Sequence, residues 1–148
     1  MPDLITANEY VERFGYVETG DLLTKQEVIS DATDRTVTAM KAAMETNGKL
    51  NADVVEAIEL YIDEAESLVK VHISSAYAYP PVNVEPILKD ITKHMARYFF
   101  YDNFDRNTIP DNITGNYEKY LNILEKIKSG DITLSITADS DSTRLYAI

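Results

Sequence analysis

The sequence predicts an all-α protein: a single domain of four or five helices around one long central helix, with an extended, strand-like C-terminal arm. Apolar residues recur at helical spacing in two long stretches, and capping residues, glycines and prolines lie where such helices would begin and end. A chain of 148 residues is long enough for one hydrophobic core but not for several. We therefore divide it into a helical domain, residues 1–131, and an arm, residues 132–148.

The first helix is predicted from its capping residues. Thr6 and Glu9 have the spacing of a capping box, and Gly15 can end the helix, which places it at Ala7–Phe14. Thr24 and Glu27 repeat the capping spacing, and apolar residues continue at helical intervals to Met44. A second helix is expected there, with a break possible near residues 31–34.

The clearest helix runs from about Ala52 to Ser75, with Asn51 as its N-cap, and should be the spine of the fold. Its apolar stripe consists of Val54, Val55, Ile58, Tyr61, Ile62, Ala65, Leu68, Val69, His72, Ile73 and Ala76. A candidate acidic face on the other side is formed by Glu56, Glu59, Asp63 and Glu66. This face is either simply solvated or lines a negatively charged passage.

Two further helices complete the domain. The prolines Pro80 and Pro81 break the central helix, because they fix φ and lack an N–H donor. The next helix is expected over Pro86–Phe104, with its proline in the first turn. A turn-rich loop, residues 106–116, follows. The final helix is expected from about Gly115 to Ser129, and Gly130 stops it.

Two features indicate contacts with other chains. The Pro86 helix is apolar on two sides, and its second ridge, spaced four residues apart, consists of Ala96, Phe100 and Phe104. This ridge contacts either a neighbouring chain or residues 24–47 of the same chain. After the last helix, apolar and polar residues alternate, which is typical of a strand; the apolar ones are Ile132, Leu134 and Ile136. Such a strand, without a partner strand in its own chain, could dock on a neighbour or remain a loose terminus.

No constellation of residues indicates catalysis, so we expect no catalytic residue, no cofactor and no metal site. His94 and Asp102 share a face of one helix but lie about 12 Å apart along its axis, which favours two separate structural roles. His72 could approach His94 if their helices pack together, and an acid could then complete a zinc site. Neither helix has the spacing that puts two ligands on one face, so core histidines are favoured.

The net charge of −11 disfavours tight nucleic-acid binding, because it repels phosphate. DNA could still pass along an acidic wall without sticking to it. The sequence contains no cysteine, which excludes disulfides and thiolate sites, and no stretch that predicts a membrane span or a standard export signal. A soluble protein is expected.

Four segments are informative in their order along the chain. They are YVERFG, AIELYIDEAESLVKVHISSAYAYPPV, EPILKDITKHMARYFFYDN and YEKYLNILEKIKSGDITLSI. Together they resemble the head-completion or head-to-tail connector proteins of Mu-like tailed phages. Two departures from the family pattern occur: DITKHMARY has two additional residues before its Ala-Arg-Tyr, and the stretch Thr24–Leu50 is longer than the usual spacer.

The resemblance implies a structural adaptor without enzymatic activity. It implies a homo-oligomeric ring in the virion neck, beneath the portal, which extends the DNA conduit and contacts tail or stopper proteins. No specific nucleic-acid binding and no membrane contact are expected, and the protein would be made in the bacterial host cytoplasm. Two alternatives are a small helical metal-dependent enzyme built on His72, His94 and an acid, and a bacterial helical protein-interaction module.

Overall fold

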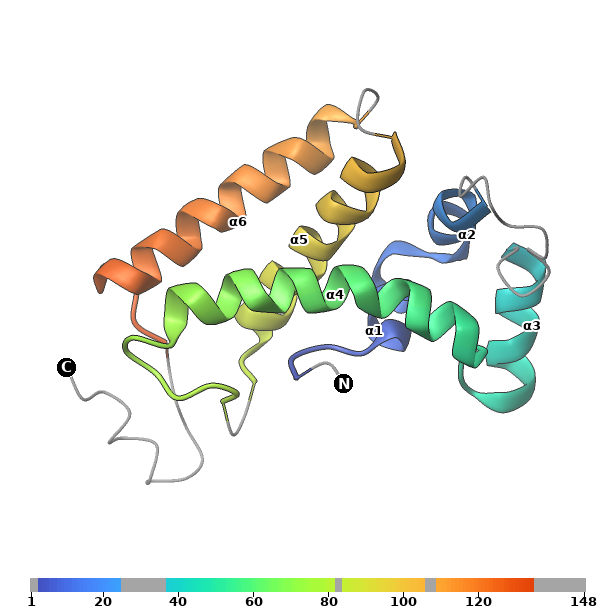
Figure 1. The fold of residues 1–148 in the computed structure, drawn as a ribbon, viewed down its shortest axis with the longest axis horizontal. Helices are drawn as coiled ribbons and strands as arrows, with labels where there is room; N and C mark the ends of the chain where they lie inside the picture. The colour runs from blue at the N-terminus through green and yellow to red at the C-terminus, as the bar shows by residue number, and fades with distance from the viewer. Residues whose placement is uncertain (1–2, 25–36, 82–83, 106–108, 135–148) are drawn as a thin grey trace.

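The long central helix organises the fold. In the computed structural model, which describes residues 3–24, 37–81, 84–105 and 109–134, this helix is α4 (Ala52–Ile73). It crosses in front of α1 and α5 in Figure 1 and contacts α1, α5 and α6. Within the described ranges the chain forms six helices and no strand, which confirms the all-α class. The predicted apolar stripe of α4 provides most of its buried residues.

Helix α1 (Ala7–Phe14) begins and ends as the sequence predicts. The Thr6 side chain accepts a hydrogen bond from the Glu9 backbone N–H, and the Glu9 carboxylate accepts one from the Thr6 N–H. Gly15 ends the helix at φ 94°, a left-handed value that favours glycine. The capping box is a local interaction, and it therefore shows in the sequence.

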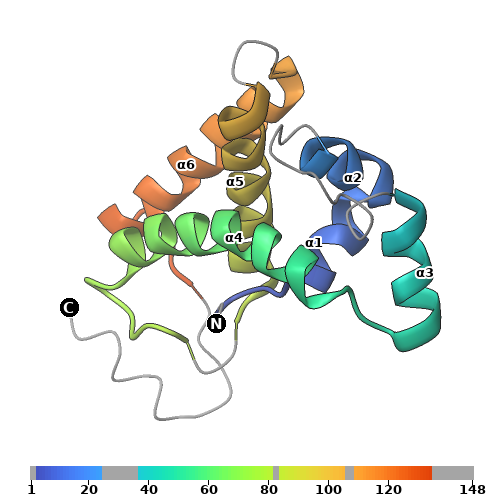
Figure 2. The ribbon, with the colours of Figure 1, turned by 45° about the vertical axis from the view of Figure 1, so that its right-hand side comes forward.

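The next two helices differ from the prediction. An unpredicted helix, α2 (Tyr16–Thr24), starts directly after Gly15, so Thr24 ends a helix here. Its Thr19 hydroxyl donates to the Gly15 carbonyl. The following helix, α3 (Val37–Asn47), agrees with the second half of the predicted one, and the first half, residues 25–36, lies outside the described residues. Both helices lie to one side of α4 in Figure 2.

Helices α5 (Pro86–Asp105) and α6 (Asp111–Ser129) form a packed pair against α4 (Figures 1 and 2). Helix α6 begins four residues before the predicted start, because Pro110 occupies the N-cap and the residues after it are helical. The buried Ile113 lies in this added turn. Gly130 ends α6 in the left-handed conformation, as predicted.

The prediction that a neighbouring chain covers the second ridge of α5 is wrong for two of its three residues. Ala96 and Phe100 are 0% exposed, and both belong to the hydrophobic core. The Phe100 ring stacks on Tyr61 of α4 at a centroid distance of 4.5 Å and lies 6.1 Å from Tyr10 of α1. The ridge therefore meets α1 and α4 of the same chain. The Phe104 side chain lies outside what the structure describes.

The beginning of the predicted arm also packs on its own chain. Ile132 lies against the core, and Leu134 is buried, with its N–H donating to the Tyr77 hydroxyl at 2.9 Å. Leu134 therefore neither docks on a neighbouring chain nor belongs to a loose terminus, which corrects both alternatives at this residue. Ile136 lies outside the described residues, as does everything after Leu134. Among the helices that the structure describes, none could span a bilayer.

Candidate assembly surfaces

The acidic side of α4 is not the uniform face that the sequence predicts. Glu56 and Asp63 are exposed and Glu59 is half-buried, so these three fit the prediction. Glu66 does not fit, because it is only 6% exposed. The outward side also carries two large apolar residues, Leu60 and Val71, which are 61% and 63% exposed.

Glu66 holds the N-terminal segment against α4. Its carboxylate accepts three backbone N–H bonds, from Asp3 at 2.8 Å, Leu4 at 2.6 Å and Ile5 at 3.2 Å. Burial raises the pKa of Glu66, and the three N–H donors oppose that rise by stabilising its charged form. The signal was present in the sequence: Glu66 lies four residues after Ile62 and three before Val69, on a column of the apolar stripe.

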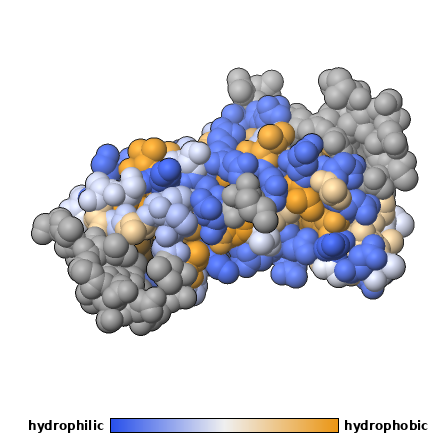
Figure 3. Space-filling model, turned by 60° about the horizontal axis from the view of Figure 1, so that its bottom comes forward, coloured by the Kyte–Doolittle hydropathy of each residue, from blue (hydrophilic) through white to orange (hydrophobic). Residues whose placement is uncertain are grey.

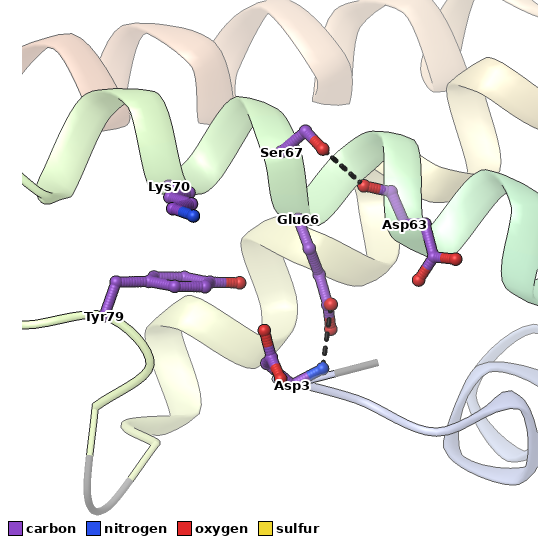
Figure 4. Close-up of a pocket in the computed structure, with 6 residues that line it drawn as sticks. All are labelled: Asp3, Asp63, Glu66, Ser67, Lys70 and Tyr79. Atoms are coloured by element: carbon purple, nitrogen blue, oxygen red, sulfur yellow. Dashed lines mark hydrogen bonds between the residues drawn. The ribbon is translucent and has the colours of Figure 1, made fainter. Parts of the chain in front are cut away.

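A pocket of about 290 Å³ lies beside this carboxylate (Figure 4). It is lined by Asp3, Asp63, Glu66, Ser67, Lys70 and Tyr79. The Lys70 ammonium lies 5.7 Å from the centre of the Tyr79 ring. Burial, together with nearby carboxylates, raises the pKa of Tyr79, so its hydroxyl stays protonated. The Ser67 hydroxyl at its edge donates to the backbone carbonyl of Asp63.

The face drawn in Figure 3 is mostly hydrophilic. Where the structure describes this face, hydrophobic residues form small patches that hydrophilic ones separate. Small patches of this kind are normal on proteins, and contacts made through them depend on charge and shape as well as on apolar area.

A strip of aromatic and basic side chains crosses α1, α5 and α6. The His94 ring of α5 stacks on Tyr120 of α6 at 4.8 Å and meets the edge of Phe14 of α1 at 5.2 Å. Arg13 lies over Phe14 at 5.2 Å from its ring centre, and Lys119 lies over Tyr120 at the same distance. We call these five residues the aromatic strip. Both cations at its ends are exposed.

Arg97 ties the strip to α2. Its guanidinium donates two hydrogen bonds to the Glu18 carboxylate, at 2.8 Å and 2.6 Å, and lies 4.4 Å from the centre of the Phe14 ring. Fork-shaped pairs of this kind fix geometry as well as charge. Sequence reasoning missed this pair, because its members are far apart in the chain and nothing local links them.

His94 is a buried, neutral histidine. Burial, with the nearby cations Arg13, Arg97 and Lys119, lowers its pKa to about 4, although Asp90 acts in the opposite direction. Its Nδ1 atom has no hydrogen-bond partner among the described residues. The ring is therefore uncharged near neutral pH and packs against Tyr120 and Phe14.

This depressed pKa predicts a loss of stability in mild acid. An unfolded chain takes up a proton on His94 near its ordinary pKa of 6.5, whereas the folded chain resists protonation down to about 4. The contribution of His94 to folding should therefore be intact above pH 6.5 and decline as the pH falls to about 4. Urea unfolding of the wild type and of His94→Phe across this range should show a smaller decline in the variant. An equal decline would contradict the assignment.

The predicted zinc alternative does not assemble in the part of the chain that the structure describes. His72 lies one turn after Leu68 on α4, and its Nδ1 is 2.8 Å from the Leu68 carbonyl oxygen. Within the described ranges, no three His, Cys, Asp or Glu side chains gather as metal ligands. Asp102 is half-buried on α5.

Comparison with known proteins gives the family. The chain matches the family described as Bacteriophage Mu, Gp36 over residues 16–145. It is 29% identical over 91 residues to the Mu-like prophage FluMu protein gp36 of Haemophilus influenzae, an alignment that covers 62% of this chain and 59% of that protein. The chain thus matches less than two thirds of that relative's length. No solved structure matches this chain. Because the family match covers most of the sequence, the chain belongs to the Bacteriophage Mu Gp36 family.

Proposed function

We propose that this protein is a structural component of a phage or prophage virion, an adaptor between head and tail. In this role it assembles as a ring beneath the portal, extends the DNA conduit and contacts tail or stopper proteins. The observation that carries the proposal is the family match over residues 16–145. A match of this extent includes α2 to α6, so the relationship covers most of the fold.

The chemistry of the chain supports a structural role. Two of its buried polar groups, Glu66 and His94, hold segments of the fold together. A net charge of −11 supports a protein that does not grip DNA as it passes. We therefore propose no enzymatic activity, no specific nucleic-acid binding and no membrane contact. The alternative function, a bacterial helical protein-interaction module, is disfavoured because the chain belongs to a phage family.

Deletion of the gene tests the neck role. A phage or inducible prophage without this protein should still make heads and tails, because each is built from its own proteins. The two should fail to join, and electron microscopy of the lysate should show separate heads and tails where the parent shows joined particles. Expression of the wild-type chain from a plasmid should restore joining. Joined, infectious particles from the deletion strain would overturn the proposal.

Binding to the portal gives an independent test. Electron microscopy of purified portal rings, with and without the chain, should show added density on one face of the ring only when the chain is present. A portal density that the chain does not change would contradict a position beneath the portal.

A further inference from the structure

The outward side of α4 combines apolar and acidic residues in one column. Leu60 is 61% exposed, and Glu56 and Glu64 lie one turn before and one turn after it, both exposed. Val71 follows on the same side about three turns beyond Leu60 and is 63% exposed. We call these four residues the α4 outer face. A leucine exposed between two carboxylates, with an exposed valine further along the same side, fits a protein contact better than the lining of a water-filled passage.

The aromatic strip offers the complementary chemistry. Phe14 and Tyr120 are half-exposed, and the exposed cations Arg13 and Lys119 flank them at either end. Arg97, beside Phe14, is paired with the Glu18 carboxylate, so the cations of the strip that could meet a carboxylate of another chain are Arg13 and Lys119. The strip is thus apolar at its centre and basic at its ends, whereas the α4 outer face is apolar and acidic.

The two surfaces lie on different sides of the molecule. On α5, Phe100 faces α4 through its stack on Tyr61, and His94, six residues earlier, lies about 120° away around the helix. On α4, Leu60 lies on the side opposite Ile58, which is fully buried. One molecule therefore cannot bring its own strip to its own α4 outer face.

We propose that copies of this chain associate head to tail, with the α4 outer face of one copy on the aromatic strip of the next. A symmetric contact between two α4 outer faces would place Glu56 and Glu64 against carboxylates of the same charge, which is unfavourable. A contact between two different surfaces leaves an α4 outer face free at one end of the assembly and an aromatic strip free at the other. Further copies can add at these ends, and the assembly closes into a ring when the rotation between neighbouring copies allows it. This inference rests on the proposed function and supplies the interface of its ring.

Cross-linking through introduced cysteines tests the contact, since the chain contains none of its own. The double variant Leu60→Cys with Lys119→Cys, treated with a short bis-maleimide at high protein concentration, should give a ladder of covalent oligomers on a denaturing gel. A matched control, Leu60→Cys with Lys41→Cys, places the second thiol at an exposed position on α3, outside both surfaces. It should give dimers at most.

Two results of cross-linking would overturn the proposal. The first is efficient dimer formation by Leu60→Cys alone, which indicates a symmetric contact through α4. The second is the absence of oligomers in the Leu60→Cys, Lys119→Cys variant at every protein concentration. Circular dichroism of each variant verifies that the helices are retained.

Charge exchange provides the second test. Glu56→Lys with Glu64→Lys, or Arg13→Glu with Lys119→Glu, should each weaken self-association by about tenfold in sedimentation equilibrium, because two attractive pairs become repulsive. The chain that carries all four substitutions should associate nearly as well as the wild type. Failure of the fourfold variant to recover, or no effect of either pair, would overturn the head-to-tail contact.

The gene deletion and the variant experiments together distinguish an error in this interface from an error in the neck role. The gene deletion reports on head-to-tail joining, whatever surface the copies use. If deletion blocks joining but the cysteine and charge variants behave like their controls, the interface is wrong and the neck role stands. The Glu56→Lys, Glu64→Lys variant could instead lose binding to the portal and keep its self-association. The α4 outer face would then bind a basic surface of the portal and not a second copy of the chain.

Discussion

Phe100→Ala should destabilise the protein by about 3–5 kcal/mol, the usual cost of truncating a fully buried phenylalanine. The ring is 0% exposed and packs between Tyr61 of α4 and Tyr10 of α1, so its loss leaves a cavity where three helices meet. Urea unfolding followed by circular dichroism would measure the loss. Phe99→Ala, at the half-buried position next to it, should cost clearly less.

The same position separates packing inside the chain from packing between chains. If Phe100 were an assembly residue, Phe100→Glu would leave a helical chain that fails to oligomerise. The packing in the structure predicts instead that Phe100→Glu loses its folded helices, because a carboxylate would be buried in the core without a partner. A folded, monomeric Phe100→Glu chain would contradict this view and return Phe100 to the surface.

Glu66→Leu should cost about 2–4 kcal/mol, because three backbone N–H groups lose their acceptor and two of these bonds are buried. The loss should be local at first: the amides of Asp3, Leu4 and Ile5 should exchange with deuterium much faster, while those in the middle of α4 change little. Native-state hydrogen exchange measures both regions in one experiment.

Two further substitutions sharpen the Glu66 test. Glu66→Gln keeps one acceptor oxygen and should give a smaller effect than Glu66→Leu. Glu59→Gln, on the same helix but only half-buried, should leave the exchange of residues 3–5 unchanged. Slow exchange of these amides in Glu66→Leu would mean that other contacts hold the segment.

The sequence was informative wherever structure is decided locally. The Thr6 and Glu9 capping box, the left-handed Gly130 and the apolar stripe of α4 all follow from spacing along the chain, and all are confirmed. Helix α2 was missed, because Gly20 in its interior and the polar residues beside it do not favour a helix, and tertiary packing overrides that preference.

What the sequence could not give was the partner of each surface. An apolar ridge predicts burial without telling which residues provide the cover. A neighbouring chain and residues 24–47 are both open from the sequence, whereas Phe100 packs on α1 and α4 of its own chain and Ala96 lies in the same core. The column of Glu66 on the apolar stripe indicates burial, but its three N–H donors lie about sixty residues away along the chain and cannot be found from local spacing. Contacts between distant segments decided both cases.

The anchor of Leu134 has a mechanical consequence. Its backbone is bonded to the hydroxyl of Tyr77, whose own N–H donates to Ile73, the last residue of α4. A load applied to the polypeptide after Leu134 would therefore pass to the end of the longest helix as well as to α6. Helix α4 would therefore bear part of any tension that acts on the C-terminal end of this chain.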